Sequence, residues 1–238
     1  MEQSFVNYAH RGASHYAPEN TMLAFYLGIW MGANGIETDV QLTADGVPVL
    51  FHDDALLRVT GQPGHVRDYD LKDLQSFRVE KGKQYDRIPT LEDFLDHFSH
   101  RELTFAIELK QPDSAPAVAE LISRYGVQEK TVVTSFDYDA IVSMRRLAPE
   151  QRTGYLTGLI DDALLAQMCA DGIYQLCPKA DMLTADKVSR WHAMGFSVRA
   201  WGVSDEQLMR HSYDCGVDGM TVNFPDKLDE YIKENADV

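Results

Sequence analysis

Residues 35–42 read Gly-Ile-Glu-Thr-Asp-Val-Gln-Leu, so acidic or polar side chains alternate with mostly apolar ones along this stretch. Because successive side chains of a strand point to opposite faces, Glu37 and Asp39 share one face. Residues 104–110 repeat the pattern and place Glu108 on their polar face. In a parallel barrel the apolar face lies under the surrounding helices, and the other face lines the interior up to the catalytic mouth. The two stretches therefore predict barrel strands with acids near the mouth.

The rest of the chain alternates short β-branched or apolar runs with longer helical patterns. The runs expected to form strands cover residues 6–9, 36–42, 104–109, 131–134, 152–156, 173–177, 197–201 and 219–222. The helical patterns cover residues 21–31, 91–98, 115–125, 138–147, 161–170, 185–194, 206–214 and 227–234. Such alternation favours parallel strands with helical crossovers, and eight repeats favour closure into a barrel. Since 238 residues suit one α/β barrel, we expect a single domain over residues 1–238 with the (β/α)8 TIM barrel fold.

One segment after the second expected strand breaks the alternation. The Asp-Gly pair at 45–46 is a hairpin signal, so residues 47–51 are expected to fold back beside the end of that strand. His52 would then stand near Glu37 and Asp39. Residues 60–87 are rich in glycine and charge, and we interpret them as a small insertion over the barrel mouth, not as a second domain.

The composition excludes several classes of partner. The formal net charge is −15, and nucleic-acid backbones and anionic membranes both demand basic surfaces, so neither is an expected partner. The cysteines Cys169, Cys177 and Cys215 form no C-x-x-C pair and indicate neither a disulfide framework nor a zinc cluster. The sequence has no basic, apolar leader, and no run approaches the roughly 18 apolar residues of a membrane span. We therefore expect a cytoplasmic protein without stable membrane association.

Glu37, Asp39 and Glu108 would lie on inward faces of neighbouring strands. Three carboxylates this close repel one another when ionised, so positive charge should neutralise them. A hard divalent cation such as Ca²⁺ or Mg²⁺ suits a site made only of oxygen ligands. The alternative is an internal salt-bridge cluster with one of the cations Lys110, Arg11 or Arg199.

His10 and His52 both follow apolar runs at expected strand ends. Histidine titrates near neutrality, so a pair beside a charged centre could divide the roles of general acid and general base. The alternative for each is an ordinary surface or hydrogen-bonded histidine. Asp53 is a candidate to orient His52, although adjacent residues of an extended strand face opposite ways.

Arg11, Lys110 and Trp201 are the candidates to hold a substrate. Arginine and lysine could bind an anionic substrate and stabilise its transition state, or they could serve as plain counter-ions to the acids. Trp201 ends the seventh expected strand on the face shared with Arg199. Its ring could wall a pocket for a cationic head group or pack in the core.

Short motifs in a fixed order sharpen these alternatives. They are His10-Arg11-Gly12, Pro18-Glu19-Asn20-Thr21, Ile36-Glu37-x-Asp39-Val40, Asp45-Gly46, His52-Asp53-x-x-Leu56, Ile88-Pro89-Thr90-Leu91, Ile107-Glu108-x-Lys110, Ser135-Phe136, Trp201 and Gly216-Val217-Asp218-Gly219. Together they resemble the glycerophosphodiester phosphodiesterase family over nearly the whole chain. The resemblance implies a (β/α)8 barrel that hydrolyses glycerophosphodiesters, such as deacylated phospholipids, to glycerol 3-phosphate and an alcohol.

The resemblance also implies a role for each candidate residue. The residues matching His10 and His52 serve as acid and base, and those matching Arg11 and Lys110 contact the phosphate. The residues matching Glu37, Asp39 and Glu108 bind Ca²⁺ or Mg²⁺. Glu19 and Asn20 would support the site, with Asn20 also capping the first helix, and residues 53–102 would form the family's characteristic insertion.

Three departures from the family pattern concern the mouth. Asn223 stands where the family usually has Asp, Gly202-Val203-Ser204 follows Trp201 where Thr-Asn is frequent, and His15 replaces a frequent Gly. They bear on head-group preference or loop anchoring, because every charged site residue is retained. Two rivals remain at this stage, a phospholipase D-like lyase on the same barrel and a non-catalytic phosphate- or metal-binding module. The sequence does not fix the oligomeric state, and a homodimer is one alternative.

Overall fold

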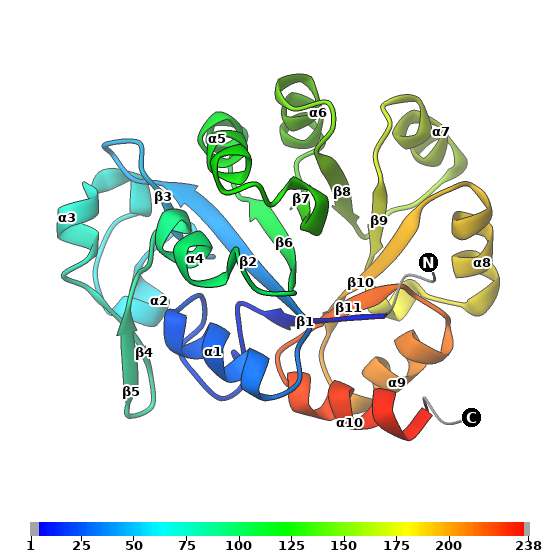
Figure 1. Cartoon of the computed structure of the whole chain (residues 1–238), viewed down its shortest axis with the longest axis horizontal. Coiled ribbons are helices and arrows are strands. Elements are labelled where there is room, and N and C mark those ends of the chain that lie inside the picture. Colours follow the sequence, from blue (N-terminus) through cyan, green and yellow to red (C-terminus); the bar gives the residue numbers. More distant parts are fainter. Residues whose placement is uncertain (1–4, 236–238) are drawn as a thin grey trace.

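Eight parallel strands close into a barrel in the computed structural model, which describes residues 5–235 (Figure 1). In barrel order they are β1 (Val6–His10), β2 (Gly35–Leu42), β6 (Thr104–Leu109), β7 (Thr131–Ser135), β8 (Arg152–Thr157), β9 (Gln175–Pro178), β10 (Ser197–Val203) and β11 (Gly219–Val222). The first strand closes the ring by pairing in parallel with both β2 and β11. The predicted TIM barrel fold is therefore confirmed. Residues 1–4 and 236–238 of the expected domain lie outside the described residues.

Helices form an outer ring around the strands (Figure 1). They are α1 (Met22–Trp30), α4 (Leu91–Phe98), α5 (Ala115–Tyr125), α6 (Tyr138–Leu147), α7 (Asp162–Ala170), α8 (Ala185–Ala193), α9 (Glu206–Asp214) and α10 (Pro225–Asn235). Short 3-10 turns cover Val66–Asp68, Pro112–Ser114, Gln128–Lys130 and Ala180–Met182. Within residues 5–235, no helix has the length and apolar character that crossing a membrane requires.

Six ring helices, α1, α4, α6, α7, α8 and α9, begin at a side chain that accepts a hydrogen bond from the first turn. Thr90 caps α4 by accepting a hydrogen bond from the Asp93 amide, and the Asp93 side chain accepts one from the Thr90 amide. The apolar side of α4 then buries Phe94 and Phe98 against the strands, edge to face with Phe25 of α1. Burial of this kind stabilises the ring by about 1.5–3 kcal/mol per large side chain.

The strand expected at 173–177 lies further along, at Gln175–Pro178. Ile173 donates its amide hydrogen to the Met168 carbonyl at the end of α7, so it closes the helix instead of joining the sheet. The apolar character of Ile173 is satisfied by core packing and not by strand pairing. The expected boundary was therefore wrong by two residues.

Residues 47–51 fold back as predicted, with β3 (Pro48–Leu50) antiparallel to the end of β2. The segment beyond is more ordered than its composition suggested. It contains α2 (Leu57–Thr60), α3 (Leu71–Leu74) and a hairpin of β4 (Arg78–Lys81) and β5 (Gln84–Arg87). A separate apolar cluster joins this segment to β3.

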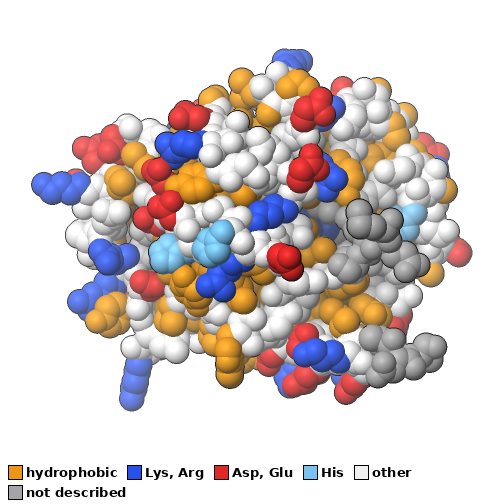
Figure 2. Space-filling view, viewed as in Figure 1, with side chains coloured by type: hydrophobic (Ala, Val, Ile, Leu, Met, Phe, Trp, Pro, Cys, Tyr) orange, Lys and Arg blue, Asp and Glu red, His pale blue; other side chains and the backbone are white. Residues whose placement is uncertain are grey.

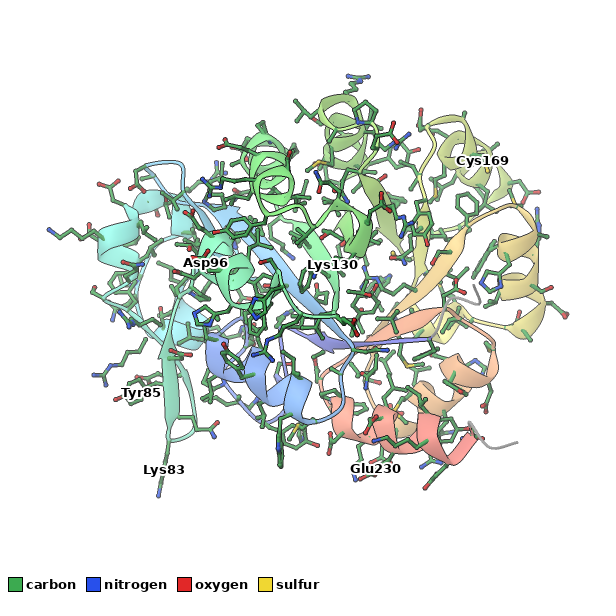
Figure 3. All side chains as sticks on the ribbon, in the orientation of Figure 1. Lys83, Tyr85, Asp96, Lys130, Cys169 and Glu230 are labelled. Atoms are coloured by element: carbon green, nitrogen blue, oxygen red, sulfur yellow. The ribbon has the colours of Figure 1, made fainter. Side chains whose placement is uncertain are left out.

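The segment lies at the side of the barrel next to α1 and α4 (Figure 1). Lys81 donates to the Ser14 carbonyl, and Asp86 accepts a hydrogen bond from the Leu23 amide at the start of α1. Lys83, at the tip of the hairpin, points away from the barrel (Figure 3). The helix α4 belongs to the main core and not to the separate cluster. The insertion bounds of 53–102 remain a prediction.

Candidate active site

Strand register brings the acidic residues together at one end of the barrel. Asp39 pairs directly across from Glu108 in the β2–β6 ladder, and Glu37 pairs with His10 in the β1–β2 ladder. The exposed fractions are 3% for Glu37, 0% for Asp39 and 7% for Glu108. One carboxylate oxygen from each lies within 4.8 Å of the others.

The cations considered from the sequence are present but only partly neutralise the acids. Lys110 Nζ lies 2.7 Å from Glu108 Oε1 and 3.5 Å from Asp39 Oδ1, and Arg11 Nε lies 3.2 Å from Asp39 Oδ2. Burial would raise the pKa of Asp39, but Arg11 and Lys110 outweigh it and lower that pKa.

The other two acids are left with excess negative charge around them. Burial and repulsion from Asp39 raise the pKa of Glu37 to about 8 and that of Glu108 to about 7. Asp39 Oδ1 is buried and accepts no hydrogen bond. An all-oxygen donor set with this charge fits a hard divalent cation. These three residues could hold one.

Arg11 and Asn20 have an unusual backbone conformation, with φ angles of +53° and +54°. Asn20 tolerates this left-handed region better than most residues. Its amide hydrogen bonds to the Arg11 carbonyl at 2.9 Å, and its side chain donates to Asp39 Oδ2 at 2.8 Å. The expectation that Asn20 caps the first helix was wrong. Thr21 is the cap, accepting from the Ala24 amide, because the Asn20 side chain is committed to Asp39 and Thr38.

Arg58, from α2, was not anticipated and connects two parts of the site. Its guanidinium donates to both carboxylate oxygens of Glu19, at 2.7 and 2.8 Å, and also to Asp53. Glu19 in turn accepts from Arg11 Nη1 at 2.8 Å. The hydrogen bonds from Arg58 lower the pKa of Asp53 to about 2. The only signal for Arg58 in the sequence is its place five residues after Asp53.

His52 is hydrogen-bonded through Nδ1 to Asp53 Oδ1 at 2.8 Å. Residues 51–54 are not a strand, so the rule that neighbours face opposite ways does not apply to them. Within residues 5–235, no hydrogen bond or ion pair joins the His52 side chain to the three acids. The pKa of His10 is lowered mainly by burial and then by Arg11, and the nearby His52 ring adds a smaller effect in the same direction.

His10 has a different partner. Its Nδ1 lies 2.5 Å from Asn223 Oδ1, which also accepts a hydrogen bond from Ser14 Oγ. The opposite ring nitrogen, Nε2, lies 3.9 Å from Glu37 Oε2. Burial and then Arg11 lower the pKa of His10 to about 4. The neutral side chain of Asn223 thus contacts His10 directly.

A pocket of about 280 Å³ opens beside the acids. His10, Arg11, Glu37 and Glu108 line one part of it, and Trp201 with its neighbours lines another. The Trp201 ring packs edge-on against Phe136 with ring centroids 4.8 Å apart. Trp201 therefore walls the pocket. Lys110 lies next to it, lining a hollow that shares Glu108 with the pocket.

The sequence matches the model of the "Glycerophosphoryl diester phosphodiesterase family" over residues 10–227. The chain belongs to this family. It is a phosphoric diester hydrolase, and a divalent metal ion is typical of the family.

Individual members of the family are similar over nearly the full length. A glycerophosphodiester phosphodiesterase of Bacillus altitudinis is 34% identical, covering 92% of this chain and 95% of its own. A phosphodiesterase of Oleispira antarctica, solved in complex with the product sn-glycerol-3-phosphate, has 30% identity and a TM-score of 0.87, covering 95% of this chain and 96% of its own. A putative glycerophosphoryl diester phosphodiesterase of Silicibacter pomeroyi has the same fold, with a TM-score of 0.90, 24% identity and coverage of 98% and 95%.

Proposed function

We propose that this phosphodiesterase hydrolyses glycerophosphodiesters, such as deacylated phospholipids, to glycerol 3-phosphate and an alcohol. The observation that carries the proposal is the meeting of Glu37, Asp39 and Glu108 with His10 and Arg11 at one end of the barrel. The product-bound Oleispira antarctica relative supports this substrate class. The cytoplasmic location and the homodimer remain predictions.

Glu37, Asp39 and Glu108 are the proposed ligands of the divalent cation, Ca²⁺ or Mg²⁺. When bound, such an ion withdraws charge from a phosphoryl oxygen and so favours attack on the diester. Arg11 and Lys110, which form ion pairs with Asp39, would hold the non-bridging phosphate oxygens. Trp201 would receive the head group.

We assign the role of general base to His10 and that of general acid to His52. Burial and then Arg11 lower the pKa of His10, which favours the unprotonated ring, so it can accept a proton from the nucleophile. The Asp53 carboxylate orients the His52 ring through Nδ1, and His52 is the group assigned to donate a proton to the departing alcohol. The nucleophile is water or the substrate's own 2-hydroxyl, and detection of a cyclic glycerol phosphate during turnover distinguishes the two.

Glu19 and Asn20 support this arrangement without touching the substrate. Asn20 donates a hydrogen bond to Asp39 Oδ2, and Glu19 accepts one from Arg11 Nη1. Both contacts keep a charged group in one geometry before substrate binds.

The test is the release of glycerol 3-phosphate from a panel of glycerophosphodiesters, with and without a chelator. We expect the wild-type protein to release it, chelator to abolish the release, and Glu37→Ala to lower the rate by at least about a hundredfold. Glu230→Ala, which removes an exposed acid on α10, is the control and should behave as wild type (Figure 3). Activity that survives both the chelator and Glu37→Ala would contradict the metal site.

A further inference from the structure

The Gln41 side chain is buried on β2, two residues beyond Asp39, with an exposed fraction of 2%. Its amide nitrogen donates to the Phe51 carbonyl at 3.0 Å and to the Asp53 carbonyl at 2.7 Å. Those two residues stand immediately before and after His52. Both amide hydrogens of Gln41 are therefore used on the main chain that carries this histidine.

The main chain at His52 has left the sheet. The Phe51 amide still donates to the Asp39 carbonyl at 3.0 Å, but residues 51–54 adopt no regular secondary structure. A carbonyl that loses its strand partner needs another donor, because unpaired buried backbone groups are costly. Gln41 supplies that donor on both sides of His52.

We propose that Gln41 is a positioning residue that holds His52 in place for catalysis. A side chain from a rigid barrel strand fixes the backbone around the ring, and the Asp53 carboxylate fixes the ring itself. The proposal rests on the catalytic role proposed above for His52.

The chain contains a matched control for this arrangement. Gln151 is also 2% exposed, and its amide nitrogen donates to the carbonyls of Thr131 and Arg152, at 2.6 and 3.1 Å. Thr131 and Arg152 begin β7 and β8, at the end of the barrel opposite the mouth. Removing the hydrogen bonds of Gln151 should therefore lower the stability of the protein about as much as removing those of Gln41. Unlike the change at Gln41, it should leave His52 in place.

The experiment compares Gln41→Met with Gln151→Met, because methionine keeps the length of glutamine and removes its donors. For Gln41→Met we expect kcat for glycerol 3-phosphate release to fall about ten- to a hundredfold, with KM within about twofold, since a small displacement of a catalytic group has such an effect. For Gln151→Met we expect kcat within about twofold of wild type. Equal losses of kcat in the two variants, or no loss in Gln41→Met, would overturn the proposal.

Two further measurements keep the test decisive. Gln41→Asn retains an amide that is one methylene shorter and reaches a single carbonyl, so its kcat should lie between those of wild type and Gln41→Met. The imidazole NMR signals of His52, measured without substrate, should shift in Gln41→Met and stay unchanged in Gln151→Met. If the wild-type protein released no glycerol 3-phosphate the proposed function would fail, whereas unmoved His52 signals would defeat only the role of Gln41.

Discussion

The two histidines of the site occupy regions built in different ways. His10 is the last residue of a central barrel strand, and its partner is the neutral Asn223, 213 residues away in the sequence. His52 lies in an irregular segment, and its partner is the adjacent Asp53 carboxylate. A barrel strand thus carries the first ring, and an irregular segment held by side-chain hydrogen bonds carries the second.

One residue type can thus perform two tasks when its surroundings differ. The polar partner of His10 is a neutral amide, whereas the polar partner of His52 is a carboxylate. Strand β1 and Asn223 hold His10, whereas Gln41 and Asp53 hold His52. Changing each of these contacts in turn should affect the two histidines differently.

The largest effect is expected from removal of either ring. His10→Ala and His52→Ala should each lower kcat for glycerol 3-phosphate release by about 10²–10⁴-fold, because each removes one partner of a proton transfer. His192→Ala is the matched control. His192 Nε2 lies 3.1 Å from Asp218 Oδ2, and His192 does not line the pocket. A variant of His10 or His52 as active as the control would break the comparison.

A smaller effect is expected from changing the side chain that hydrogen-bonds to each histidine. Asn223→Asp places a carboxylate against His10 and should raise its pKa, which lies at about 4, by about one unit or more. The acidic limb of the profile of kcat/KM against pH should then move to higher pH.

Asp53→Asn is the reciprocal change. It removes the anion beside His52 and a partner of Arg58, so we expect about a tenfold lower kcat with the acidic limb unmoved. The measurement for both variants is the pH dependence of glycerol 3-phosphate release. Identical profiles for the two variants would show that the difference in partners is without consequence.

The smallest effect concerns the stability of the metal-free protein. The pKa of Glu37 is raised to about 8 in the fold, so the protonated form is favoured and its stabilising contribution is lost as pH rises toward 8. The lowered pKa of His10 acts in the opposite direction, but only below about pH 6.5. Glu108, whose pKa is raised to about 7, acts in the same direction as Glu37. Between pH 6.5 and 8, the free energy of unfolding measured with chelator should therefore fall by about 2 kcal/mol.

Glu37→Gln should flatten this pH dependence, because an amide does not ionise. Added Ca²⁺ or Mg²⁺ should stabilise the wild-type protein more at pH 8 than at pH 6.5. Denaturant unfolding at the two pH values measures both effects. A variant with the full wild-type slope would show that Glu37 is not the group that titrates.

Much of the fold and of the site could be predicted from local patterns. Alternation at 35–42 placed Glu37 and Asp39 on one face, and the register with β6 then set Glu108 opposite Asp39. Contacts that depend on an irregular backbone were missed. Asn20 was expected to be a helix cap, but its left-handed φ turns the side chain toward Asp39. Basic side chains lie scattered among acidic ones on the face shown in Figure 2. Apart from its place five residues after Asp53, no feature of the sequence therefore distinguished Arg58 from the other basic residues as the one that links Glu19 and Asp53.

The barrel, the family and the residue types of the site follow from the amino-acid order, because strand periodicity and short motifs are local properties of the chain. The contacts between these groups follow from the folded arrangement of distant segments. Asn223 meets His10 because the barrel closes between its first and last strands, and Gln41 holds His52 because β3 folds back along β2. Such contacts depend on the positions of several segments at once, and side-chain hydrogen bonds form only within about 3 Å.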